Sequence, residues 1–181
     1  MGPAFRFLLV AGLAAACSSG GPEGSSGGWS AVPTAAAPAT VNCGDPIEAL
    51  GPGAPGLASL DGSFPASVGR GGDGTFSGAV TLVAHQALAG VASPLADVYV
   101  VRDGLVVTVP LPTDAVGTAV RVPAGGTAVF DAVGTIAGCD GPGARLAPGR
   151  YDVYAVVTVT GDGGPGTEVV APGGPWPLEV V

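Results

Sequence analysis

A length of 181 residues fits one folded domain, with room left for an N-terminal leader or linker. The 14 acidic residues are scattered singly and the 6 basic residues are all arginine, which argues against a nucleic-acid partner, because such partners require clustered cations. The lack of lysine excludes Schiff-base and Ser–Lys catalysis. Glycine and proline are abundant, but 47% apolar and 11% charged residues argue against a disordered chain. Both residue types punctuate β-branched runs, as in an all-β domain.

The first sixteen residues show the three regions of a secretory signal peptide. Arg6 precedes an apolar stretch over residues 7–16, and small residues end that stretch. The stretch is too short to span ~30 Å of hydrocarbon as a helix, which argues against a transmembrane segment. We therefore predict export of the chain, with residues 1–16 as the leader and a net charge of −9 once Arg6 is removed.

The run Leu13-Ala-Ala-Ala-Cys17 resembles the lipobox of bacterial lipoproteins. That family attaches diacylglycerol, and with it palmitate-type acyl chains, to the cysteine. The resemblance implies a lipid anchor on Cys17 and a location on the extracytoplasmic face of the cell membrane. The family prefers leucine three residues before the cysteine, where this chain has Ala14. Ordinary signal-peptide cleavage at the same bond, or retention of the segment, are the alternatives.

Residues 17–40 read as a tether between the anchor and a folded domain. Their first half is rich in Gly and Ser and their second half in Ala and Pro, a composition typical of flexible linkers that become stiffer with proline. We expect this lipid-anchored linker to hold residues 41–181, the predicted domain, away from the membrane surface.

The cysteine count supports this arrangement. If a lipid occupies Cys17, Cys43 and Cys139 remain, and an even pair in an oxidising compartment forms one disulfide. Two free thiols are the alternative. One histidine and two cysteines at this spacing fit no zinc pattern, so we predict no metal site.

The folded part begins with an ill-defined stretch, 41–74, which we read as ordered coil with one short strand at most. Residues 75–85 then alternate, with Phe76, Val80, Leu82 and Ala84 on one face, as in a half-buried strand. Residues 97–109 form two β-branched runs around Asp103-Gly104, a sequence that predicts a tight hairpin turn.

The second half continues as strands. Residues 117–122 and 127–133 read as another strand pair around a turn at 123–126, and residues 150–160 form a long strand. The residues of that long strand expected to point inward are Tyr151, Val153, Ala155, Val157 and Val159. Two short runs, 167–170 and 176–181, end the chain. About seven strands and no helical period predict an all-β fold, an immunoglobulin-like antiparallel β-sandwich.

Tyr151 follows a Pro-Gly turn just inside its strand, which resembles the tyrosine corner of immunoglobulin-like sandwiches. A tyrosine that only fills the core is the alternative. The cysteine pair does not match the antibody bridge, because Cys43 lies far ahead of the first clear strand. The run 97–110 followed by this Pro-Gly-x-Tyr strand also resembles the bacterial intracellular proteinase inhibitor domain, a small sandwich whose inhibitory role maps onto no particular residue here.

Candidate catalytic residues are few. His85, the only histidine, ends a strand and is expected on the surface, and the motifs of serine hydrolases, zinc peptidases and phosphate loops are absent. Five acids precede glycine and are expected to form turns: Asp61, Asp73, Asp103, Asp140 and Asp162. The sequences around Asp140 and Asp162 lack the spacing of a calcium loop. Trp176 is expected to close one end of the sandwich, and Trp29 to lie unpacked or near a membrane interface.

Together these patterns predict a non-catalytic protein without a cofactor. The leading hypothesis is a surface-anchored domain that binds a protein or a cell-envelope component. The alternative is a module that inhibits extracytoplasmic peptidases. A hydrolase that uses two carboxylates is a third hypothesis, and it requires two acids that converge in a deep pocket.

Overall fold

The computed structural model describes residues 40–113, 116–161 and 167–181. The predicted leader, Cys17, Trp29, the tether up to residue 39 and Asp162 lie outside these ranges. Within the described residues, no helix is long and apolar enough to cross a membrane.

The described residues contain one short 3-10 helix and ten strands. Their bounds are η1 Ile47–Leu50, β1 Ala58–Ser63, β2 Ser67–Val68, β3 Thr75–Ala84, β4 Leu88–Ala92, β5 Leu95–Arg102, β6 Leu105–Thr108, β7 Thr118–Val122, β8 Thr127–Thr135, β9 Gly149–Gly161 and β10 Glu168–Val180.

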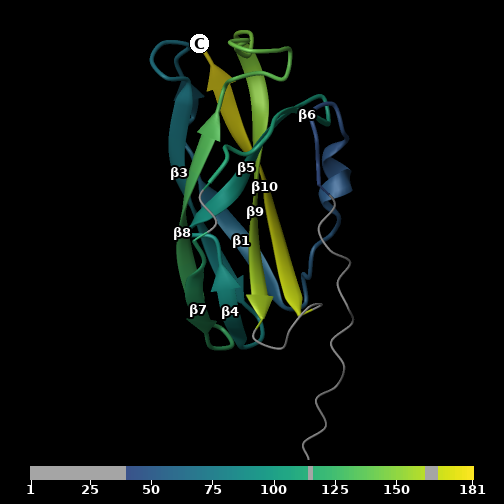
Figure 1. Cartoon of the computed structure of the whole chain (residues 1–181), viewed down its shortest axis with the longest axis vertical. Coiled ribbons are helices and arrows are strands. Elements are labelled where there is room, and N and C mark those ends of the chain that lie inside the picture. The colour runs from purple at the N-terminus through teal and green to yellow at the C-terminus, as the bar shows by residue number, and fades with distance from the viewer. Residues whose placement is uncertain (1–39, 114–115, 162–166) are drawn as a thin grey trace, which may run out of the picture. The chain divides into compact units, whose positions relative to one another are not determined.

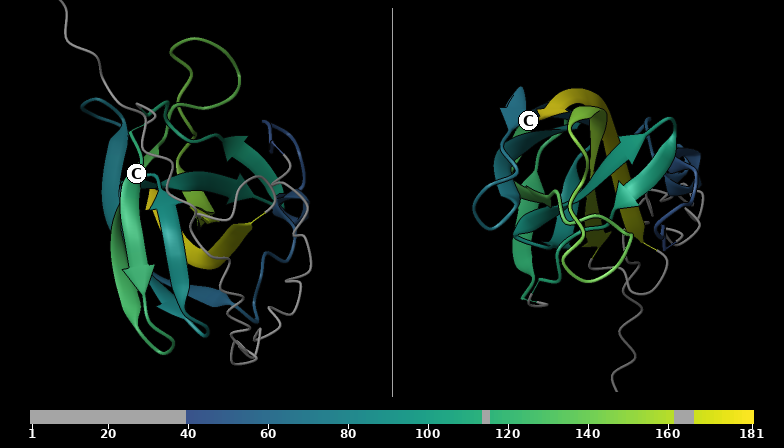
Figure 2. Two further views of the ribbon diagram at one scale, coloured as in Figure 1. Left: turned by 60° about the horizontal axis from the view of Figure 1, so that its bottom comes forward. Right: turned by 90° about the horizontal axis from the view of Figure 1, so that it is seen from above.

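The strands form two layers around a common core (Figures 1 and 2). One layer is β1-β3-β8, paired antiparallel. In the other layer, β9 pairs antiparallel with β10, β5 and β4. Beyond these strands, β10 pairs with β2, β5 pairs with β6, and β4 pairs with β7. β5 connects the layers, because Leu95 and Ala96 pair with β8 whereas residues 97–101 pair with β9. The predicted all-β sandwich is confirmed.

The main core is built from the inward faces of the long strands. The predicted inward residues of β3 are all buried, and so are those of β9. Both sets follow the period of two that a pleated strand imposes on its side chains. β9 is also buried on its outer face at Val156, so it passes through the domain with apolar contacts on both sides.

Several elements differ from the predictions. The stretch 41–74 contains η1, β1 and β2, and all six residues of β1 pair with β3. β4 was not predicted, because its Ala and Gly give a weak strand signal. The strands at 118–122 and 127–135 do form, but they do not pair with each other: β7 pairs with β4 and β8 with β3, in opposite layers. The two short terminal runs are one strand, β10, with an irregularity between Gly173 and Trp176.

Trp176 fills the side of the sandwich between β1 and β10. Its ring is half-buried and packs against Phe64 at 5.2 Å between ring centroids. Gly62 of β1 lies under the ring, where an added Cβ would come within 2.5 Å of it. Phe64 in turn meets Phe76 edge-on at 6.3 Å. These rings extend the main core to the surface at this side.

Gly78 of β3 makes room for this aromatic packing, and its replacement should destabilise the fold. An alanine Cβ at this position would lie 2.7 Å from the Ser63 carbonyl oxygen and against the Phe64 ring. Because the oxygen belongs to the backbone of a paired strand, relief requires a shift of β1. We expect Gly78→Ala to lower the free energy of unfolding by about 1–3 kcal/mol in urea titrations.

The matched control for this substitution is Gly69→Ala. Its new Cβ meets no atom within 4 Å and its backbone is not in the left-handed region. We expect a change within about 0.5 kcal/mol. Equal losses at the two glycines would contradict the packing argument.

Candidate functional site

The candidate catalytic residues do not converge. His85 is exposed directly after β3, and its backbone N–H donates to the Leu57 carbonyl. Among the described residues, no group of three His, Cys, Asp or Glu side chains is close enough to hold a metal ion.

The acids that precede glycine mostly have local structural roles. Asp103 adopts φ 54° and Gly104 φ 80°, as the tight β5–β6 turn requires. The Asp73 carboxylate accepts hydrogen bonds from the backbone N–H (3.0 Å) and the hydroxyl (2.9 Å) of Thr75, which lower the pKa of Asp73. Asp140 lies in a turn. Asp61 contradicts the prediction, because it lies within β1 opposite Thr81.

Two titratable side chains on β5 have raised pKa values, but they do not form an acid–base pair. Burial raises the pKa of the Asp97 carboxyl group, and burial together with the charge of Asp97 raises the pKa of Tyr99. Asp97 borders a hollow of ≈160 Å³, in which the other lining side chains are not ionisable: Leu95, Ala96, Pro110, Leu111, Pro112, Thr113 and Val133. Asp97 is thus the one ionisable side chain among the residues that line this hollow.

The predicted disulfide between Cys43 and Cys139 is confirmed. It joins positions 96 residues apart, with 5.8 Å between the Cα atoms. Cys139 lies in the loop between β8 and β9, residues 137–146, which we call the cysteine loop. Figure 2 shows this part of the chain, in green, projecting at one end of the domain.

The disulfide fastens a segment that covers the outer face of the β9 layer. Residues 41–50, which we call the strap, pack on that face and form a second apolar cluster with it. From the strap come Val41 and Ile47, and from the layer come Tyr99, Val101, Val106, Val156 and Val170. Backbone hydrogen bonds support the contact: Gly44 donates to Val106 (2.8 Å), and Ile47 donates to Gly104 (3.0 Å).

Tyr151 makes the hydrogen bond that a tyrosine corner requires. Its hydroxyl donates to the Ala147 carbonyl at 2.8 Å, four residues upstream. The Arg102 guanidinium lies 5.5 Å from the centre of the Tyr151 ring and donates to the same hydroxyl at 3.5 Å. The ring itself belongs to the main core. Tyr151 thus links the residue that follows the cysteine loop to the start of β9.

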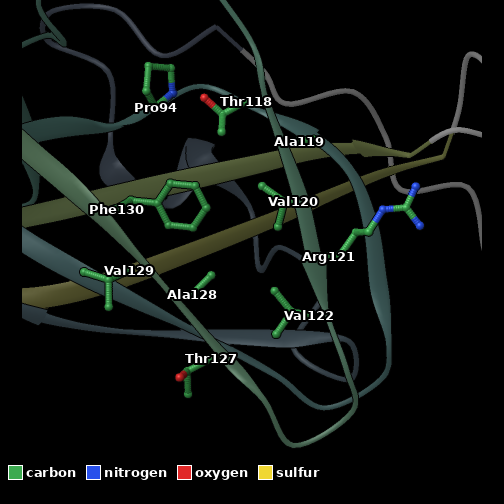
Figure 3. Close-up of a pocket in the computed structure, with 10 residues that line it drawn as sticks. All are labelled: Pro94, Thr118, Ala119, Val120, Arg121, Val122, Thr127, Ala128, Val129 and Phe130. Carbon is green, nitrogen blue, oxygen red and sulfur yellow. The ribbon is translucent and has the colours of Figure 1, made fainter.

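A second hollow lies between β7 and β8, which belong to different layers. It has a volume of ≈350 Å³ and is lined by ten residues (Figure 3): Pro94, Thr118, Ala119, Val120, Arg121, Val122, Thr127, Ala128, Val129 and Phe130. We call it the edge groove. Sequence patterns do not reveal this groove, because they predict that 117–122 and 127–133 pair, and such a pair has no opening between its strands.

Comparisons with known proteins show only distant structural likenesses. No protein-family model and no curated protein matches the chain. The CARDB domain of the PF1109 protein from Pyrococcus furiosus, solved with di-metal ions, is 15% identical, with a TM-score of 0.37 over 68% of this chain and 92% of that domain.

Two longer proteins give similar values, each over 68% of this chain. A β-glucosidase from Listeria innocua is 18% identical with a TM-score of 0.38, and the chain covers 16% of it. The alkylpurine DNA glycosylase AlkC from Pseudomonas fluorescens is 15% identical with a TM-score of 0.38, and the chain covers 30% of it. Structural similarities this distant give no information about the function of this chain.

Removal of the Tyr151 hydroxyl should destabilise the domain. Tyr151→Phe keeps the core ring but leaves the Ala147 carbonyl without its donor, so we expect a loss of about 1 kcal/mol in the free energy of unfolding. Tyr154→Phe on the same strand is the control, because the Tyr154 hydroxyl makes no hydrogen bond within the described residues. If both variants lose the same stability in urea titrations, Tyr151 only fills the core.

Proposed function

We propose that this chain is a non-catalytic binding domain that a lipid on Cys17 holds at the extracytoplasmic face of a membrane. The observation that carries the location is the Cys43–Cys139 disulfide. Such bridges persist in oxidising compartments and are rare in the bacterial cytoplasm. With Cys43 and Cys139 consumed by the bridge, Cys17 is the one cysteine of the sequence left for lipid attachment.

The binding role is supported by what the described side chains do. The acids and the histidine are dispersed over turns, strand ends and strand faces, whereas most of the residues that line the edge groove are apolar and come from two strands. Binding sites are commonly apolar hollows with few polar groups. A surface of this kind recognises a partner by shape and backbone contacts.

The cysteine loop is the observation that supports the alternative function, a peptidase inhibitor. An inhibitor presents a rigid, protruding loop, and this loop projects at one end while the disulfide and Arg145 hold its two sides. Its tip, residues 140–143, is exposed. Inhibition of an extracytoplasmic peptidase that is lost when the loop is shortened would favour this alternative over the binding domain.

The anchor predicts a specific distribution of the chain in cells. When the full chain is expressed in a bacterium, we expect it in the membrane fraction, with an N-terminal Cys17 whose intact mass includes the lipid. Cys17→Ala should move the protein to the aqueous extracytoplasmic fraction. The double variant Cys43→Ala/Cys139→Ala is the control, and it should stay in the membrane fraction because the lipid site is intact.

Two results would contradict the anchor. One is a wild-type protein whose N-terminus is Ser18, and the other is an unmodified Cys17 in the intact mass.

A further inference from the structure

The edge groove is bounded by two strand edges that have no partner in the described part of the chain. β7 pairs with β4 on one side alone. β8 pairs with β3 along its whole length, but on its other side it meets β5 only at Asp131 and Ala132, which leaves Thr127–Phe130 unpaired. Alternate residues of an unpaired edge present their N–H and C=O groups outward, so both sides of the groove offer backbone hydrogen bonds.

Between these edges the groove has an apolar floor. Val120 and Val122 of β7 and Phe130 of β8 point into the space between the two strands, and each is less than 8% exposed (Figure 3). Ala128 adds a small side chain beside them. Small alternate side chains from an incoming strand would complete this part of the main core, whereas bulky ones would meet Phe130.

The charge of the groove limits what can enter it. Arg121 is the only charged residue among the ten that line it, and it lies exposed in β7. A carboxylate in the occupant would therefore be attracted. A second copy of this chain is disfavoured, because pairing of two β7 edges brings Arg121 close to its own counterpart.

From these observations we propose that the edge groove binds an extended, acidic segment of a partner protein as an added β-strand. The segment is about five residues long, or roughly 16 Å, with small or β-branched side chains in alternate positions and a carboxylate near Arg121. This inference rests on the proposed binding role and specifies its surface. It is independent of the anchor, because the Cys17 measurement gives its result whether or not the groove binds anything.

The test uses the ¹⁵N-labelled full chain and a defined probe, the peptide acetyl-Gly-Ser-Val-Glu-Val-Thr-Ser-Gly-amide. We expect the amide signals of Thr118–Val122 and Thr127–Phe130 to shift on titration, and their hydrogen exchange to slow as new backbone bonds form. A peptide with lysine in place of glutamate should bind more weakly. A peptide N-methylated at the central positions should not bind, because it cannot donate to the strand edges.

Matched charge reversals test the role of Arg121. Arg121→Glu should raise the dissociation constant of the glutamate peptide about five-fold or more and lower that of the lysine peptide. Arg121→Gln serves as a milder variant should the reversal perturb folding. Arg70→Glu, which changes an exposed residue near the C-terminal Val181, should leave both constants unchanged.

Three results would overturn the proposal. The first is no shift at millimolar peptide, and the second is a shift confined to residues outside the groove. The third is a concentration-dependent dimer whose interface signals fall on β7 and β8, which would assign the groove to a second copy of this chain.

Discussion

The strap covers the apolar side chains on the outer face of the β9 layer, and one covalent bond fastens it there. Tyr99, Val101, Val156 and Val170 point away from the main core, and residues 41–50 bury them in a second cluster. The strap is short and contains a single helical turn, so few contacts within the strap itself stabilise it. The Cys43–Cys139 bond removes much of the entropy that an unfolded strap would gain, and thereby favours a sandwich with two buried faces on this layer.

The same bond makes the cysteine loop a junction between distant segments. Cys139 donates its backbone N–H to Val107 of β6 (3.1 Å) and bonds covalently to the strap. On the other side of the loop, the Arg145 guanidinium donates to the carbonyls of residues 70–72, at 2.8 Å for Gly72. One end of the domain is thus tied across both layers. At the edge groove, by contrast, no strand pairing among the described residues joins β7 to β8.

Local patterns predicted the parts of the fold that depend on local geometry. The period of two identified the inward residues of β3 and β9, and Asp103-Gly104 identified its hairpin, because these signals require no knowledge of the partner strand. Pairing was harder. Residues 117–122 and 127–133 are neighbours along the chain and their pattern predicts a pair, yet the strands that form there pair with β4 and β3. That choice depends on which layer each strand joins, a long-range property without a sequence signature, and so the edge groove could not be predicted.

Hydrogen exchange measured on the oxidised and the reduced full chain tests most directly whether the disulfide holds the strap over the β9 layer. On reduction, the account predicts faster exchange at the strap amides that bond to the β5–β6 hairpin, Gly44 and Ile47, with protection retained in β3 and β8. The double variant Cys43→Ala/Cys139→Ala should reproduce this pattern without reductant. Unchanged protection of the strap, or an equal loss throughout the domain, would contradict the account.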